Sequence, residues 1–156
     1  MLRLTLAFLH LLALGIGLGA IWTRARSLAT QPLTVSDVRR ALVSDNWWAF
    51  AGALWIATGL WRLLAGTEKA TSYYTHNHVF FAKMAFLVLL LVMEAFAVVV
   101  MVRWRSGMKK LGDAWQPDVV GATRVRIISY VEIVLVLAMV VAAVSMARGY
   151  GYVGAA

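Results

Sequence analysis

Long apolar stretches constrain this chain more than any other feature of its sequence. The stretch from Val79 to Val102 is longer than the about 20 apolar residues that a helix needs to cross a bilayer. Three further stretches, at about 4–22, 47–64 and 127–147, are also long and apolar enough to span. In lipid, only helices and closed barrels satisfy their own backbone polar groups. The four stretches therefore predict an all-α, integral membrane four-helix bundle.

The composition agrees with a membrane protein. Hydrophobic residues make up 62% of the chain and charged residues 14%, whereas about 25% is usual for charged residues in soluble domains. The absence of cysteine excludes disulfides and thiolate metal sites. We assign the net charge of +8 to loops that set the membrane topology, so we predict no nucleic-acid partner.

The basic residues predict how the helices are oriented. They concentrate in two connections, 23–46 and 103–126, whereas the connection between the second and third stretches has only Lys69, beside Glu68. By the positive-inside rule, both basic connections are cytoplasmic loops. We therefore predict a single transmembrane domain over 1–156 with the N-terminus and the C-terminus outside.

The two predicted loops have different local signals. In the first, Thr34 or Ser36 is a candidate N-cap of a short amphipathic turn, and Asp45 with Asn46 is the candidate start of the second helix. The second loop is interrupted by Gly and Pro and is predicted to be irregular. In each half of the chain, one helix runs from the outer side of the membrane to the cytoplasm, a basic connection follows, and a second helix runs back to the outer side. This order is typical of two parallel two-helix repeats.

Two carboxylates fall inside the predicted spans. Glu94 lies eleven residues after Lys83, which places both on one helix face. Glu132 lies at a similar depth in the fourth helix. If Glu94 and Glu132 meet, one of them would be protonated or the two would share a cation, which favours a functional role. The alternative is that each is neutral or pairs with a loop arginine such as Arg24 or Arg103.

Basic side chains gather in the outer half of the predicted bundle. His10 is in the first helix, Arg62 ends the second, Lys83 opens the third, and His76 and His78 precede it. Such a set suits haem b, with imidazole on iron and basic groups on the propionates, or an anionic head group. On this basis His10 and His78 are the candidate metal ligands. The alternative is a hydrogen-bonded core histidine with snorkelling cations.

Glycines mark helix faces that allow close helix contact. Gly15 and Gly19 have G-x-x-x-G spacing, Gly17 shares a face with His10, and in the second helix Gly52, Gly59 and Gly66 fall at heptad spacing. Small residues let helix backbones approach each other in a membrane. We therefore expect His10 to point into the bundle.

Several motifs in order carry a resemblance to a known family. The stretches "FLHLLALGIGLGAIWTRAR", "SDNWWAFAGALWIATGLWR", "TEKATSYYTHNHVFFAKM" and "VRWR" resemble an uncharacterised family of bacterial four-helix membrane proteins, a domain of unknown function. The resemblance covers most of the first 105 residues and implies a multi-pass protein of the bacterial cytoplasmic (inner) membrane. The residues that match the family's pattern are His10, Asp45, Gly59, Arg62, Glu68, Lys69, Tyr73, Tyr74 and Lys83.

That family is in turn distantly similar to the copper-resistance CopD type and to the HemJ type of protoporphyrinogen oxidase. The similarity implies haem or porphyrin chemistry at His10 and Lys83. Phe81 stands where the HemJ pattern has histidine, so ligation of haem by two histidines would require His78 instead. Likeness at this distance is an analogy and establishes no activity.

Three functions follow, in order of preference. The first is a non-catalytic accessory subunit of a larger respiratory or photosynthetic membrane complex, because four helices leave little room for a private cavity. Its partners would be the lipid bilayer and other membrane subunits. The alternative is a b-haem or porphyrin-binding protein, and the third is a proton or cation transporter using Glu94 and Glu132. The chain has no P-loop, G-x-G-x-x-G or H-E-x-x-H motif, so the sequence indicates no particular enzyme class.

Overall fold

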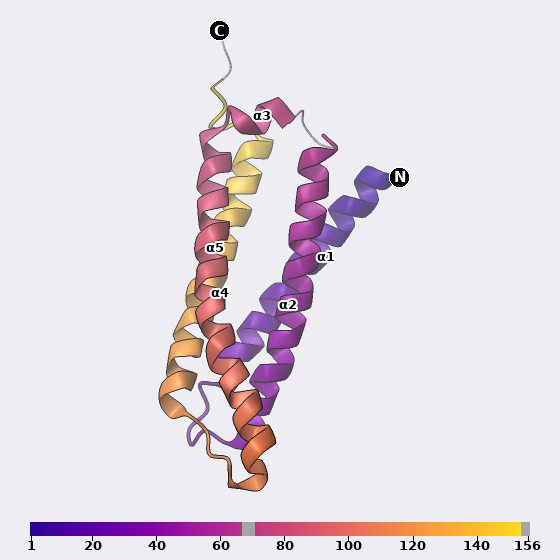
Figure 1. Cartoon of the computed structure of the whole chain (residues 1–156). Coiled ribbons are helices and arrows are strands. Elements are labelled where there is room, and N and C mark those ends of the chain that lie inside the picture. The colour runs from indigo at the N-terminus through magenta and orange to yellow at the C-terminus, as the bar shows by residue number, and fades with distance from the viewer. Residues whose placement is uncertain (67–70, 154–156) are drawn as a thin grey trace.

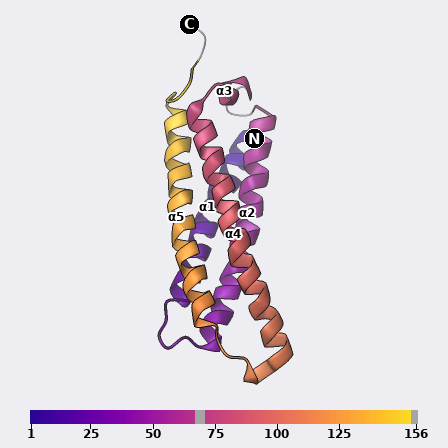
Figure 2. The same ribbon diagram turned by 60° about the vertical axis from the view of Figure 1, so that its left-hand side comes forward.

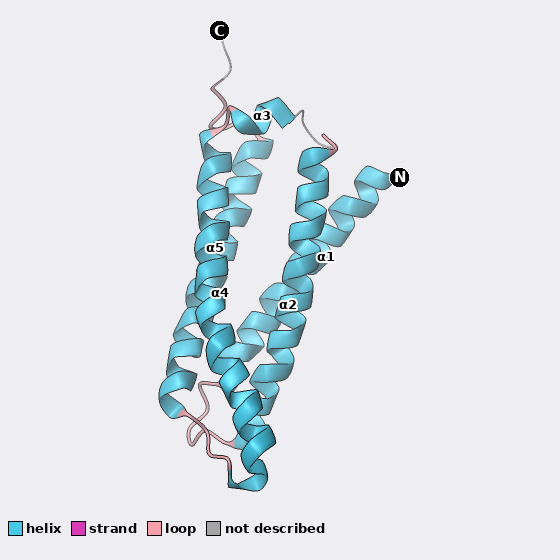
Figure 3. Ribbon diagram, viewed as in Figure 1, coloured by secondary structure: helices cyan, strands magenta, loops and turns pink. Residues whose placement is uncertain are grey.

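The computed structural model describes residues 1–66 and 71–153, and helices make up most of this part of the chain. Within this part there is no strand, so the all-α prediction is confirmed (Figure 3). Glu68 and Lys69, which belong to the family pattern, lie outside the described residues. The elements are α1 (Leu2–Ser27), α2 (Val35–Leu64), α3 (Thr71–Thr75), α4 (His78–Leu111), the 3-10 helix η1 (Gly112–Ala114) and α5 (Val119–Ala147).

The long helices run side by side as two pairs (Figures 1 and 2). α1 packs against α2, α4 packs against α5, and α1 also contacts α5. The chain enters α1 and leaves α5 at the end where α3 lies, which we call the α3 end (Figure 1). Connections 28–34 and 112–118 lie at the opposite end, which we call the basic end.

Three helices are long and apolar enough to cross a membrane: α1, α4 continued by η1, and α5. α2 falls short of the same criterion, although its segment 47–64 was predicted to span. Four tryptophans and Arg62 within this segment lower its hydropathy. The four-span topology with both termini outside therefore stays a prediction.

The helices are longer than the predicted spans. The segments 4–22, 47–64, 79–102 and 127–147 all lie inside helices, but most of the predicted loops is helical as well. The prediction that the second loop is irregular is wrong except near 112–118. Hydropathy marks where lipid contact ends, whereas the helix continues until the backbone is capped or turned.

The start of α2 is set by a capping box at Thr34. The Thr34 side chain accepts a hydrogen bond from Asp37 N at 3.3 Å, and the Asp37 carboxylate accepts one from Thr34 N at 3.0 Å. The predicted cap at Asp45 and Asn46 is wrong, because both lie inside α2 and Asp45 is buried. The predicted amphipathic turn is the first part of α2.

The ends of α4 and α5 also have side-chain or glycine signals. The Asn77 side chain accepts hydrogen bonds from the first amides of α4, and the Asp118 side chain accepts one from Gly121 N in α5. α4 ends at Gly112, whose φ of 53° lies in the left-handed region that favours glycine. These signals leave only a short connection between α4 and α5.

Most of the packing lies at the basic end and in the middle of the molecule. At the basic end Trp104, Trp115 and Met101 are buried between α2, α4 and α5. In the middle, Gly17 allows the Trp48 ring to lie so close that a Cβ there would be 3.1 Å from it. No described atom lies within 4 Å of a Cβ built on Gly15 or Gly19, so the close approach occurs at Gly17 rather than at the G-x-x-x-G pair.

Candidate functional site

Arg24, near the end of α1, is fully buried and holds a charge cluster together. Its Nη1 donates to Asp45 Oδ1 at 3.0 Å and to Glu94 Oε2 at 3.0 Å. Its Nη2 donates to Glu132 Oε2 at 2.6 Å, and its Nε donates to Ser129 Oγ at 2.9 Å. Charge-assisted bonds of this kind are the strong ones, so one guanidinium ties α1 to α2, α4 and α5.

Arg105 extends the cluster toward the surface. It comes from α4 and donates to Asp45 Oδ2 at 3.1 Å and to Asn46 Oδ1 at 2.8 Å. Asp45 therefore accepts from two guanidinium groups. Removing one member of a buried ion pair leaves an uncompensated charge, which costs far more than the pair contributes.

The two predicted carboxylates meet at the same guanidinium. Glu132 is fully buried, whereas the Glu94 side chain is 16% exposed. The arginine that they contact is Arg24, one of the two that the sequence suggested, although it belongs to a helix. The other, Arg103, is exposed. The Oε1 atom of Glu132 is buried and has no hydrogen-bond partner among the described residues.

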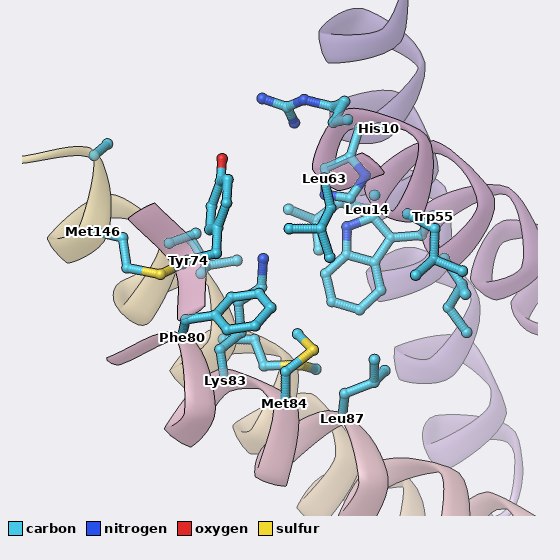
Figure 4. Close-up of a pocket in the computed structure, with 18 of the residues that line it drawn as sticks. His10, Leu14, Trp55, Leu63, Tyr74, Phe80, Lys83, Met84, Leu87 and Met146 are labelled. Atoms are coloured by element: carbon cyan, nitrogen blue, oxygen red, sulfur yellow. The ribbon is translucent and has the colours of Figure 1, made fainter. Parts of the chain in front are cut away.

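A pocket of about 590 Å³ opens between the two helix pairs toward the α3 end (Figure 4). All five α-helices contribute side chains, most of them apolar, such as Leu14, Met84 and Leu87. The size lies within the roughly 300–1,000 Å³ typical of small-molecule sites. The expectation that the helices leave little room for a private cavity is therefore wrong, because the pairs pack closely only in the middle and at the basic end.

His10 forms part of the pocket wall with a defined ring orientation. Its Nδ1 lies 2.9 Å from Thr58 Oγ1, while the Thr58 hydroxyl donates to Leu54 O at 2.7 Å. Because that hydroxyl proton is already used, His10 Nδ1 is the donor and Nε2 keeps its lone pair. Gly59 leaves room for the ring, since a Cβ there would lie 3.2 Å from His10 Cε1.

Two cationic side chains are among the pocket residues. Lys83 extends from α4 with its amine toward the space below His10 (Figure 4), and Arg62 lines the pocket from α2. Lys83 has no ion pair or hydrogen bond within the described part of the chain. The described pocket lining thus contains two cationic side chains and no aspartate or glutamate.

The structure does not bring His78 to His10. His78 begins α4, is exposed, and does not line the pocket. His76 is also exposed, with Nδ1 2.9 Å from Ser72 O. Among residues 1–66 and 71–153, no group of three or more His, Asp or Glu side chains is placed to hold a metal ion. The predicted two-histidine ligand set is not assembled.

α3 contributes Tyr73 and Tyr74 to the pocket wall at the α3 end. The Tyr73 hydroxyl donates to Met146 O of α5 at 2.9 Å, and its ring stacks on Tyr152 with centroids 4.8 Å apart. The side chain of Asn77, the N-cap of α4, donates to Tyr150 O at 3.1 Å. α5 and the segment after it thus contact both α3 and the start of α4.

Several members of these sites were not singled out from the sequence. Asp45 was interpreted as a cap, and Ser129 and Thr58 were not considered. A helix that begins at Thr34 places Asp45 one heptad after Val38, on the buried face of α2. The capping box was thus the signal that could have identified Asp45. No comparable signal marked Ser129 or Thr58.

Residues 2–151 match the model of a family described as "Predicted membrane protein (DUF2214)". No curated protein and no solved structure matches the chain.

Proposed function

The chain belongs to the DUF2214 family of membrane proteins, and from that premise we propose that it binds an amphiphilic anion in the pocket between the helix pairs. The supporting observation is an apolar cavity of about 590 Å³ into which Lys83 projects without a described counter-ion. An ammonium group in such surroundings favours an anionic partner. The apolar walls suit a ligand with a hydrocarbon or aromatic body.

The polar atoms of the pocket suggest how such a ligand is oriented. Lys83 and Arg62 would hold its carboxylate or phosphate, and His10 offers a lone pair on Nε2. The indole Nε1–H of Trp55 is buried without a partner among the described residues. A ligand acceptor would satisfy this donor, as buried donors usually require.

Haem b is one amphiphilic anion that the pocket residues fit. His10 would bind the haem iron through Nε2, with Thr58 fixing the ring through Nδ1, and Lys83 would pair with a propionate. A second histidine ligand is not available at His78. Bound haem would supply electron-transfer or ligand-binding chemistry, while the chain supplies orientation and an apolar enclosure.

The pocket favours ligand binding over the accessory-subunit role. A purely structural subunit has no need of a cavity that is lined by all five α-helices and contains a lysine with no counter-ion among residues 1–66 and 71–153. We place the protein in the bacterial inner membrane with the pocket in its outer half, following the positive-inside rule. Association with other membrane subunits stays a prediction.

Binding can be measured with cis-parinaric acid, a fluorescent fatty acid, added to the purified protein in detergent. We expect saturable fluorescence, and Lys83→Met should weaken binding about tenfold or more, since a charge-assisted hydrogen bond contributes about 1.5–3 kcal/mol and each 1.4 kcal/mol is about tenfold. Lys109→Met changes an exposed lysine at the basic end of α4 and is the matched control. The methyl ester of the probe should bind independently of Lys83.

Equal binding of the free acid to the wild type and to Lys83→Met would overturn the proposal. The haem version has its own measurement, the absorption spectrum after addition of haem. A Soret shift that is lost in His10→Ala but kept in His78→Ala would identify His10 as the single ligand. If both variants kept the shift, the haem version would be wrong.

A further inference from the structure

The cluster around Arg24 contains one more carboxylate than guanidinium groups. Asp45, Glu94 and Glu132 face Arg24 and Arg105. The side chains of Arg24 and Glu132 are 0% exposed. A net charge in such an interior is costly unless a proton or another ion neutralises it.

One carboxylate oxygen of Glu132 accepts no hydrogen bond from the described members of the cluster. Its Oε2 binds Arg24 Nη2, but its Oε1 is buried without a hydrogen-bond partner among the described residues. Glu94 contacts the adjacent Nη1 of the same guanidinium, so the two glutamates lie next to each other. We propose that the Glu94–Glu132 pair binds one exchangeable proton, which brings the cluster to zero net charge.

The charged groups around the pair explain why the proton belongs there. Among the described residues, α1 presents Arg24, α2 presents Asp45, α4 presents Arg105 beside Glu94, and α5 presents the neutral Ser129 beside Glu132. Asp45 accepts hydrogen bonds from both guanidinium groups, so two positive charges stabilise its ionised form. Glu94 is the partly exposed member of the pair, and a proton enters and leaves through it.

This proton site is separate from the anion pocket. Arg24 lies 14 residues after His10 on α1, which is about 21 Å along a helix axis. Substitutions at Glu94 or Glu132 should therefore leave the binding of cis-parinaric acid unchanged. Failure of either proposal would not affect the other.

Infrared spectroscopy of the protein in lipid measures the proton directly. The wild type should show the carbonyl band of a protonated carboxylic acid, and D₂O should shift this band because the proton exchanges. Glu132→Gln and Glu94→Gln should each remove the band, because the remaining two carboxylates balance Arg24 and Arg105. Asp113→Asn, an exposed residue of η1, is the control and should keep it.

Asp45→Asn distinguishes charge balance from simple burial. It leaves both glutamates in place but lowers the carboxylate count to two, so the band should disappear. Arg105→Gln should have the opposite effect and increase the band. If Glu132 were neutral only because it is buried, the band would survive in Asp45→Asn and in Glu94→Gln, and the shared-proton proposal would be wrong.

Two results on the wild type alone would also overturn the proposal, so it does not depend on the variants folding. One is the absence of any protonated carboxylic acid band, with sodium or potassium stabilising the protein against thermal unfolding, which would identify a bound metal cation instead. The other is a band that D₂O does not shift, which would show that the proton does not exchange.

Discussion

At the scale of single residues, the position of His10 depends on the absence of a side chain at Gly59 in α2. Gly59 has no side chain, so the imidazole lies against the helix backbone and reaches Thr58. Gly52, one heptad earlier on α2, has no described atom within 4 Å of a Cβ built on it. Two glycines on one helix thus have different roles, and only Gly59 shapes the pocket.

Alanine at these two glycines should separate helix propensity from packing. Gly52→Ala should stabilise the protein by about 0.5–1 kcal/mol, because glycine inside a helix costs about that much relative to alanine. Gly59→Ala should gain less or lose stability, since the new methyl group would lie 3.2 Å from His10 Cε1 and the ring would have to move. Thermal unfolding in detergent measures the stability difference.

The same pair of variants tests whether the position of the ring matters for binding. Affinity for cis-parinaric acid should fall in Gly59→Ala and stay unchanged in Gly52→Ala. Equal affinity in both would mean that the placement of His10 by Gly59 is irrelevant to the ligand.

At the scale of elements, α2 is the helix on which both sites depend. It contributes Asp45 to the charge cluster and Gly59 and Arg62 to the pocket, and its Thr58 contacts the ring of His10. Its register is set at Thr34, where the capping box fixes the first turn. A change at this cap therefore acts on the element that connects the two sites.

Thr34→Ala should destabilise the protein by about 1 kcal/mol, the usual cost of losing an N-cap side chain. Thr123→Ala is a suitable control, because Thr123 is a partly exposed threonine in α5 and its described hydrogen bond runs to Val119 O within its own helix. Thermal unfolding at neutral pH should show a lower midpoint for Thr34→Ala than for the control. Equal midpoints would mean that the cap does not determine where α2 begins.

The same cap predicts a dependence on pH. Hydrogen bonds from the Thr34 side chain and then from its backbone N–H lower the pKa of the Asp37 carboxyl below its ordinary value. A lowered pKa in the folded state contributes stability above the unfolded-state pKa, and this contribution is lost as pH falls through the folded-state pKa. The difference in unfolding midpoint between the wild type and Asp37→Asn should therefore shrink on acidification, and a constant difference would contradict the assignment.

At the scale of the whole molecule, the helix pairs pack closely in the half toward the basic end and lie further apart in the half toward the α3 end. The pairs α1–α2 and α4–α5 are held together by the Arg24 cluster and by apolar packing around Trp104 and Trp48. Toward the α3 end the same pairs enclose the pocket. One fold thus has a rigid charged centre and a separate cavity.

The absence of cysteine allows the membrane topology to be tested with single cysteines. Thr30→Cys lies in the connection after α1, and Ser72→Cys lies in α3 at the opposite end. A membrane-impermeant maleimide applied from outside should label Ser72→Cys and not Thr30→Cys. Labelling of both from one side would mean that α2 does not cross the bilayer.

The sequence by itself determined the class of the protein. Apolar stretches long enough to span predict helices without reference to any contact, because lipid leaves the backbone almost no other choice. The membership of the uncharacterised family, predicted from motifs such as those around His10 and Lys83, is confirmed. The ends of the helices could not be predicted as well, because hydropathy contains no information about N-cap residues such as Thr34.

Only the tertiary structure decided which polar side chains meet. Sequence periodicity placed Glu94 and Glu132 on helix faces, but the partner Arg24 and the addition of Asp45 depend on how four helices cross in space. The pocket likewise arises from the spacing of two helix pairs, and the same spacing leaves His78 outside it. A helix repeat fixes directions around one axis, whereas distances between axes come from packing many side chains at once.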